Sequence, residues 1–278
     1  MHEKQLDCGG KPLDLSLPRV MGVLNVTPDS FSDGGDFFTP GKALEHARRM
    51  VGEGAAIIDV GGESTRPGAQ AVPLQEELRR VIPVIEALSR QLPVPVSIDT
   101  RKPAVMQAAV AAGAGMINDI NALQADGALE TAAGLGVPVC VMHMQGTPAS
   151  MQDNPDYGDV VREVADFLAD RAAACIAAGI PRAHVLLDPG FGFGKTVEHN
   201  LRLLRHLDRL AAAGFPLLVG LSRKSMIGKL LDLPVDERLF PGVALAVLAV
   251  WQGAAIVRSH DVRATREAIE MCAAVRNT

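Results

Sequence analysis

The feature that most constrains this chain is a unit that recurs along it. Each unit is a short, nearly continuous apolar run followed by a stretch rich in Ala, Leu, Glu and Arg with helical spacing. Such runs are typical of strands that are buried on both faces of a sheet. Eight of them occur, at residues 20–26, 55–61, 94–100, 114–120, 137–144, 184–190, 216–223 and 254–260. Strands that alternate with helices predict a parallel sheet.

Eight such units in one chain of 278 residues favour a closed (β/α)8 barrel, the TIM barrel. No shift in composition and no Ser- or Pro-rich linker divides the sequence, so we expect a single α/β domain over residues 1–278. We place its core at about residues 19–275, with residues 1–18 as an N-terminal extension. An open, doubly wound sheet is the alternative that the same alternation allows.

Charge and cysteine placement narrow the classes of function. The formal net charge is −5, whereas a surface for nucleic acid needs an excess of basic residues. The four cysteines are scattered without a C-x-x-C pair, which is typical of reduced thiols. The N-terminus carries charges and lacks the apolar segment of a signal peptide. We therefore expect a cytoplasmic protein that binds no nucleic acid.

One uncharged run, residues 240–257, approaches the length of a membrane span. It contains Pro241, Gly242 and Gly253, which interrupt a spanning helix. We expect a buried helix that continues into a buried strand, and no contact with a membrane.

The predicted strands share a second property, because each one runs into a polar or ionisable residue. These residues are Asn25, Asp59, Asp99, Asn118, Asp119, His143, Asp188, Ser222, Lys224, Arg258 and His260. Any one of them, for example Asp59, is easily explained alone as a helix cap. In a barrel, however, the carboxyl ends of all strands meet at one mouth, where barrel enzymes have their active sites. The set therefore predicts a functional site at that end.

The types of residue in this set indicate the kind of ligand. Carboxylates and amides such as Asp99, Asn118 and Asp188 suit a flat heterocycle that offers both donors and acceptors. Cations such as Lys224 and Arg258, with His260 as a further candidate, suit phosphate or pyrophosphate. The residues alone therefore predict a phosphorylated heterocyclic substrate.

Two long polar loops follow the first two predicted strands. Residues 25–38 are rich in Gly, Ser and Asp, and residues 61–70 contain "STRPG". Loops of this kind at a barrel mouth are commonly lids that order on substrate binding, although simple flexible connections are the alternative. Asn25, with Asp29 or Asp33, offers the hard oxygen ligands that Mg²⁺ prefers.

The stretch Asp188–Thr196, "DPGFGFGKT", approaches the P-loop pattern of nucleotide-binding proteins. The first Gly of that pattern would fall on Pro189, and the pattern explains none of the other strand ends. We therefore reject a phosphate cradle here and expect Lys195 and Thr196 to form the solvated start of the next helix.

Together these motifs resemble the bacterial dihydropteroate synthase family, in the family's order and over about residues 19–270. The stretches that carry the resemblance are "GVLNVTPDSFSDGG" (22–35), "DVGGESTRPGA" (59–69), "SIDTRKPAV" (97–105), "INDI" (117–120), "VMHMQGTP" (141–148), "LDPGFGFGKT" (187–196), "LVGLSRKS" (218–225) and "RSHDV" (258–262). The resemblance implies a TIM barrel independently of the periodicity.

The resemblance also implies a reaction, in which 6-hydroxymethyl-7,8-dihydropterin pyrophosphate and p-aminobenzoate give 7,8-dihydropteroate and pyrophosphate with the help of Mg²⁺. It implies a monofunctional transferase of folate biosynthesis that forms a homodimer. The alternative within the same structural class is a pterin-binding methyltransferase domain, which presents methyl-tetrahydrofolate to a corrinoid partner protein.

Site residues follow from the resemblance position by position. Those implied for the pterin ring are Asp99, Asn118, Asp188 and Lys224. Those implied for the pyrophosphate are Asn25, Thr65, Arg258 and His260, with Asn25 also binding Mg²⁺. Those implied for the p-aminobenzoate pocket, which sulfonamides also occupy, are Phe31, Arg66, Pro67, Phe193 and Ser225. Asp99, Asp188, Lys224, Arg258 and His260 are the expected catalytic residues.

Overall fold

A closed ring of eight parallel strands forms the centre of the molecule, in a computed structural model that describes residues 5–27, 40–64 and 68–278. The strands are β3 Arg19–Asn25, β4 Ala55–Gly61, β5 Val96–Asp99, β6 Met116–Asp119, β7 Val139–Met142, β8 Val185–Asp188, β9 Leu218–Gly220 and β10 Ile256–Ser259. Their order follows the chain from β3 to β8, and β10 pairs with both β3 and β9. A bridge between Leu187 and Leu217 joins β8 to the entry of β9 and closes the ring. The predicted TIM barrel is confirmed.

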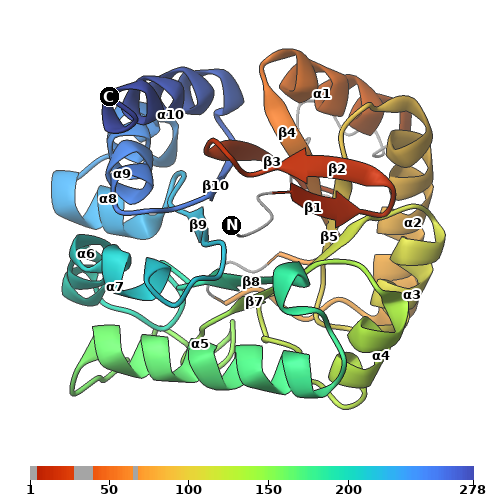
Figure 1. Ribbon diagram of the computed structural model, residues 1–278, viewed down its shortest axis with the longest axis horizontal. Helices are drawn as coiled ribbons and strands as arrows, with labels where there is room; N and C mark the ends of the chain where they lie inside the picture. The colour runs from red at the N-terminus through yellow and green to blue at the C-terminus, as the bar shows by residue number, and fades with distance from the viewer. Residues whose placement is uncertain (1–4, 28–39, 65–67) are drawn as a thin grey trace.

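Helices surround this ring (Figure 1). They are α1 Pro40–Gly52, α2 Leu74–Gln91, α3 Pro103–Ala111, α4 Ala128–Leu135, α5 Val160–Ala177, α6 Val197–Arg205, α7 Leu207–Ala211, α8 Ser225–Leu231, α9 Leu239–Trp251 and α10 Val262–Arg276. The chain turns back after α3 and α9 at Gly113 and Gly253, both with φ of 106°, a conformation that favours glycine. The eight strands lie where the sequence pattern placed them, although each is as long as or shorter than its apolar run.

An antiparallel hairpin of β1 Gln5–Cys8 and β2 Lys11–Asp14 covers one end of the barrel. Leu6, Cys8 and Leu13 are buried in a cluster with residues from the amino-terminal halves of the strands, among them Met116 and Leu186. Residues 5–14, which the sequence analysis assigned to an extension, therefore belong to the core. The hairpin seals the amino-terminal end, and the opposite end is left for substrate.

The uncharged run at residues 240–257 contains most of α9 and the start of β10. The expected helix followed by a buried strand is therefore confirmed. In the part of the chain that is described, no helix is both long enough and apolar enough to cross a membrane.

Candidate active site

The carboxyl ends of the strands meet at the end of the barrel opposite the hairpin. Asp99 ends β5 and lies in register beside Asn118, the penultimate residue of β6, and both are buried. Asp188, at the end of β8, is buried as well. A carboxylate loses water when it is buried and must find replacement partners in the protein. The partners found at this mouth define the site.

Arg258 is the centre of the largest polar cluster at the mouth. Its Nε donates to Asp59 Oδ2 at 2.7 Å, and its Nη2 donates to Asp99 Oδ2 at 3.0 Å. Asn118 Nδ2 donates to the same Asp59 oxygen at 3.1 Å. The guanidinium therefore joins the ends of β4, β5 and β10 in one network. Nη1 of Arg258 makes no hydrogen bond to the residues that the structure describes, so this nitrogen remains for an anion.

Burial and neighbouring charges set the ionisation of this cluster. Burial raises the pKa of Asp99 to about 7; Arg258 opposes this shift, whereas Asp59 adds to it. Burial acts against the charge of Arg258 too, but Asp59 and Asp99 hold its pKa above the ordinary value. Asp99 can therefore change between acceptor and donor near neutral pH, while Arg258 stays charged.

Asp59 was among the strand-end residues that the sequence predicted at the mouth, but it was given no role in substrate binding. It is fully buried, and its Oδ1 has no hydrogen-bond partner in the described structure. Its strand could have identified it, because β4 pairs with both β3 and β5 in the same ring and therefore brings Asp59 to the mouth. An unpaired buried carboxylate oxygen beside Arg258 is a ready acceptor for a bound ligand.

A second carboxylate and cation pair lies across the mouth. Asp188 accepts a hydrogen bond from the Gly190 N–H at 2.7 Å. Burial raises the pKa of Asp188 to about 6, although the Gly190 N–H and Lys224 act to lower it. Burial lowers the pKa of Lys224 to about 8, against the attraction of Asp188. The Lys224 Nζ atom also lies 4.1 Å from the centre of the Phe193 ring, which stabilises the ammonium.

His260 directly follows β10, two residues after Arg258, but its ionisation differs from that of a cation. Burial and the nearby charge of Arg258 lower the pKa of His260 to about 3, so the imidazole is neutral at pH 7. Its Nδ1 lies 3.1 Å from Ser222 Oγ. His260 therefore offers a hydrogen bond to a ligand, and Arg258 and Lys224 supply the positive charge.

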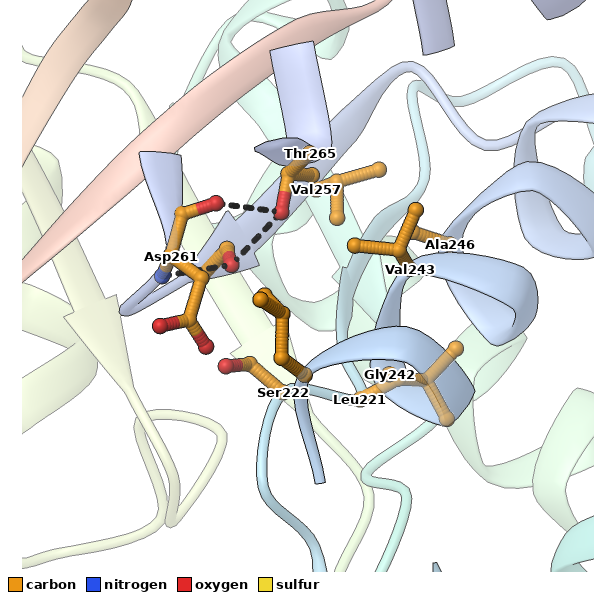
Figure 2. Close-up of a pocket in the computed structure, with 10 residues that line it drawn as sticks. Leu221, Ser222, Gly242, Val243, Ala246, Val257, Asp261 and Thr265 are labelled. Atoms are coloured by element: carbon orange, nitrogen blue, oxygen red, sulfur yellow. Dashed lines mark hydrogen bonds between the residues drawn. The ribbon is translucent and has the colours of Figure 1, made fainter. Parts of the chain in front are cut away.

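Hydrogen bonds around Ser259 fix the end of β10, on which Arg258 lies, and His260, which follows it. The Ser259 hydroxyl lies 2.9 Å from Thr265 Oγ1 and accepts from the Asp261 N–H, and Thr265 Oγ1 donates to the Asp261 carbonyl (Figure 2). Ser259 thus faces α10, and its two neighbours in the chain face the mouth, as alternation along a strand requires. The cavity drawn in Figure 2 has a volume of about 10 Å³, too small for a heterocycle, so it belongs to packing.

The β8–α6 loop, residues 189–196, corrects one expectation. Lys195 is not solvated; it is buried, and its Nζ is bonded to His143 and to backbone carbonyls. Thr196 does begin the next helix, since its side chain caps α6 by accepting from the His199 N–H. A lysine bonded to carbonyls cannot reach a phosphate, which agrees with the rejection of a nucleotide cradle.

The remaining candidates are divided between the mouth and its surroundings. Asn25 ends β3, and its Oδ1 lies near Gly61 and the Asp99 carboxylate. Ser225 is exposed at the first position of α8. Asp119 faces away, because its carboxylate accepts from the N–H groups of Asn121 and Leu123. The calls on Asp29, Phe31, Asp33, Thr65, Arg66 and Pro67 lie outside the described residues.

The oxygen ligands near Asn25 bear on the expected Mg²⁺ site. No group of three His, Cys, Asp or Glu side chains suited to a metal occurs within residues 5–27, 40–64 and 68–278. A single amide oxygen at the mouth nevertheless fits Mg²⁺ that keeps several waters and takes substrate phosphate oxygens as its other ligands. The residues present are compatible with that kind of site and not with a cage made only of protein ligands.

Comparison with known proteins gave concordant matches. Residues 21–260 match the family described as "Pterin binding enzyme". The dihydropteroate synthase of Haemophilus influenzae is 51% identical over 273 residues, which cover 98% of this chain and 99% of the relative. A Yersinia pestis dihydropteroate synthase structure with a sulfonamide drug superposes with a TM-score of 0.94 at 53% identity, covering 99% of this chain and 100% of that one. A Xanthomonas albilineans dihydropteroate synthase in complex with 7,8-dihydropteroate gives 0.90 at 50% identity, covering 99% of each chain.

Proposed function

The chain belongs to the dihydropteroate synthase family of pterin-binding enzymes, and on that premise we propose which of its residues hold each substrate. It is a transferase of folate biosynthesis that joins 6-hydroxymethyl-7,8-dihydropterin pyrophosphate to p-aminobenzoate, with release of pyrophosphate. The observation that carries the assignment of residues is the buried network of Arg258, Asp59, Asp99 and Asn118 facing Asp188 and Lys224.

The pterin ring is held by Asp99, Asn118, Asp188 and Lys224. A pterin presents ring N–H and amino donors on one edge and a carbonyl acceptor beside them. The carboxylates of Asp99 and Asp188 accept from such donors, and Lys224 donates to the acceptor. Burial of both carboxylates strengthens these bonds, because little water is left to compete for them.

The pyrophosphate is held by Arg258, His260 and Asn25; Thr65, which the resemblance assigns to the same group, lies outside the described residues. Arg258 still has Nη1 for an anion, and His260 adds a neutral hydrogen bond. Asn25 would be one of several ligands of a bound Mg²⁺ ion. When bound, the ion stabilises the negative charge on the phosphate oxygens.

The reaction transfers the pterin methylene group from oxygen to nitrogen. The departing pyrophosphate takes the electron pair of the C–O bond, the arylamine nitrogen gives its lone pair to the carbon, and the amine loses a proton to water. If bond breaking runs ahead of attack, positive charge spreads into the pterin, where Asp99 and Asp188 lie ready to stabilise it. Arg258 stabilises the charge on the leaving group.

The p-aminobenzoate pocket includes Phe193 and Ser225 at the mouth, with Phe31, Arg66 and Pro67 from the two long loops. Phe193 is buried beside Lys224, so its position links the two substrate sites. We expect sulfonamides to compete with p-aminobenzoate here and to leave affinity for the pterin unchanged.

The protein is a homodimer in this proposal. Large apolar side chains are exposed on and around α8, α9 and α10, with Phe240 82% exposed. They are Leu230, Leu231, Val235, Phe240, Leu248, Trp251, Met271 and Val275. The helices α9 and α10 pack together (Figure 1). Exposed apolar side chains gathered on neighbouring helices are typical of an interface, and a second copy of the chain is the occupant we propose. Sedimentation should give a dimer that Phe240→Ser weakens; a monomeric wild type would contradict the proposal.

The chain functions in the cytoplasm in this proposal. All four cysteines are free and buried, as expected for a protein of a reducing compartment. Fractionation of cells that produce the chain should recover it with cytoplasmic markers.

The direct test of function is to mix both substrates with the enzyme and Mg²⁺ and to measure pyrophosphate and dihydropteroate together. We expect the two products in equal amounts, and their formation to require both substrates. Binding of methyl-tetrahydrofolate without any release of pyrophosphate would support the methyltransferase alternative instead. An Asp188→Asn variant, which lacks the carboxylate of one proposed pterin ligand, is the control in this assay.

A further inference from the structure

Lys195 is a buried lysine that no substrate contact explains. Only 3% of it is exposed. Its Nζ lies 2.9 Å from His143 Nδ1 and donates to the carbonyl oxygens of Gly190 at 3.0 Å and Phe193 at 3.1 Å. The His143 carbonyl is a fourth acceptor at 3.4 Å. A buried ammonium is costly unless its protons are bonded, and here all three have acceptors.

The contact between Lys195 and His143 has a defined direction. Burial lowers the pKa of Lys195 to about 7, against the attraction of Asp188. In its ammonium form Lys195 can only donate, so in that form His143 Nδ1 accepts and the ring proton lies on Nε2. Burial and the charge of Lys195 lower the pKa of His143 to about 3. His143 therefore remains a neutral acceptor over the whole neutral range. Phe167 and Tyr157 pack on its ring at centroid distances of 5.0 and 6.0 Å and hold it in place.

The carbonyl groups that Lys195 binds are the two ends of one turn. The Phe193 N–H donates back to the Gly190 carbonyl at 3.1 Å. Gln152 holds the Gly192 carbonyl at 2.8 Å, and Tyr157 holds the Gly194 carbonyl at 2.7 Å. Side chains thus hold the carbonyl groups of all four residues Gly190, Gly192, Phe193 and Gly194, and Lys195 alone holds two of them and ties both to the end of β7.

Close packing leaves this turn little freedom. Gly190 and Gly194 have φ of 69° and 59°. A Cβ atom on Gly190 would lie 1.9 Å from the His143 carbonyl oxygen, and one on Gly194 would lie 2.4 Å from the Gln145 carbonyl oxygen. The loop therefore rests directly on the chain that follows β7. A shift of the Lys195 anchor must move the whole turn.

Phe193 lies at the far side of that turn, where its ring meets the Lys224 ammonium. We propose that Lys195 is a positioning residue for the second substrate: by binding the Gly190 and Phe193 carbonyls and His143, it fixes the Phe193 ring as a wall of the p-aminobenzoate pocket. The inference rests on the proposed function, in which Phe193 borders that pocket. Lys195 touches neither substrate in this scheme.

Lys11 supplies a matched control, because it has the same chemistry at the opposite end of the barrel. Its Nζ donates to the carbonyl oxygens of Ser89 at 2.8 Å, Leu92 at 2.7 Å and Val94 at 3.3 Å. Lys195→Met and Lys11→Met each replace a lysine that gathers carbonyls with an uncharged chain of similar length. Both variants lose structural hydrogen bonds, but only one lies under the proposed pocket.

The experiment measures KM for each substrate separately, with the other saturating. For Lys195→Met we expect KM for p-aminobenzoate to rise about tenfold or more. KM for the pterin pyrophosphate should rise by less than about threefold, because, among the residues that the structure describes, the turn makes one hydrogen bond to that site, from the Gly190 N–H to Asp188. For Lys11→Met we expect both values to stay within about twofold. Equal rises for the two substrates in Lys195→Met, or no rise in either, would overturn the inference.

A second pair of variants decides the matter if Lys195→Met does not fold. His143→Asn places an amide oxygen near the position of Nδ1 and can still accept from Lys195, whereas His143→Leu cannot. Both lose the ring contacts equally. We expect the higher KM for p-aminobenzoate in His143→Leu alone; equal values in the two variants would refute the role of Lys195. A wild-type chain that forms no dihydropteroate would refute the proposed function before any variant is compared.

Discussion

The two ends of the barrel use buried polar groups in opposite ways. At the amino-terminal end, Lys11 binds three carbonyl oxygens near the end of α2, and the apolar hairpin closes the barrel above it. At the carboxyl-terminal end, Asp59 keeps an unpaired oxygen, and the pKa of Asp99 is raised to about 7. The amino group of Lys11 therefore has hydrogen-bond acceptors for all its protons, whereas one carboxylate oxygen of Asp59 at the mouth has no partner in the described structure.

This difference shows where the fold gives up stability for function. A buried carboxylate that lacks partners costs free energy, and a closed barrel core can tolerate that cost at one end. Ligand binding then supplies the missing partners. Substitutions at the mouth should therefore change chemistry more than stability, and substitutions at the hairpin should do the reverse.

The largest effect is expected for Arg258→Met. It removes the cation that joins Asp59 to Asp99 and that stabilises the leaving group in the proposed mechanism. We expect kcat/KM to fall about a hundredfold to a thousandfold. Arg258→Lys is the control, because it keeps the charge but loses the two-pronged geometry. A kcat/KM for Arg258→Met within about threefold of wild type, measured on folded protein, would remove the leaving-group role.

The next effect sharpens the comparison from the sealed end. Leu13 is 3% exposed in the hairpin cluster, so Leu13→Ala should lower the free energy of unfolding by about 2–5 kcal/mol. Below the melting transition its kcat/KM should equal that of wild type. Leu17→Ala, at a side chain that is 44% exposed, should change stability by less than about 0.5 kcal/mol. Denaturant titrations measure the free energy of unfolding of the two variants. A lower kcat/KM in folded Leu13→Ala would contradict the claim that the sealed end contributes only to stability.

The affinity for the pterin is expected to depend on pH, because the two buried carboxyl groups at the mouth change their ionisation near neutral pH. Asp99 and Asp188, with pKa values of about 7 and about 6, must be ionised to accept from the pterin. Affinity for a pterin without pyrophosphate should fall as the pH is lowered through that range, by up to about tenfold per unit for each of the two groups. Calorimetric titration from pH 8 to pH 5 measures this affinity. Asp99→Asn should remove the upper part of the profile, and a flat wild-type profile would contradict the ionisation that we assign.

The raised pKa of Asp99 also makes the free energy of unfolding depend on pH. The direction is opposite to that of a carboxylate in an ordinary salt bridge. Because the folded-state pKa of Asp99 lies above 3.8, the folded chain binds a proton that the unfolded chain has lost. Its contribution therefore destabilises the fold increasingly as the pH rises from about 4 to about 7. Asp99→Asn should flatten that part of the profile in thermal unfolding.

The smallest effect is expected at the turn of the hairpin. Asp7 Oδ1 accepts from the Gly10 N–H at 2.7 Å in an exposed turn. Asp7→Ala should cost about 1 kcal/mol or less in the free energy of unfolding, with no change in either KM. A loss as large as that of Leu13→Ala would mean that the turn, and not the apolar cluster, holds the hairpin.

Much of this organisation could be predicted from the sequence, for a physical reason. Strands buried on both faces have a periodicity that is visible without a structure, and parallel strands bring their carboxyl ends together. Asp99, Asn118 and Asp188 were therefore identified by their place after apolar runs. The closed ring, the single domain and the helix over residues 239–251 follow from the same pattern.

Other features depend on contacts that no local pattern encodes. Asp59 looks like a helix cap until the ring places it beside Arg258, 199 residues away in the chain. Lys195 looks like a surface residue until the loop folds onto β7 and buries it. The hairpin at residues 5–14 was missed because its two strands are only four residues each, and alternating burial over four residues is a weak signal.

The central claim is that the polar end of the barrel holds the pterin and the sealed end only supports it. A crystal structure with a non-reactive analogue of the pterin pyrophosphate tests this claim most directly. Our account predicts the ring among Asp99, Asn118, Asp188 and Lys224, with the pyrophosphate against Arg258 and His260. An analogue that binds at any other place on the chain, with those side chains still paired to one another, would contradict it.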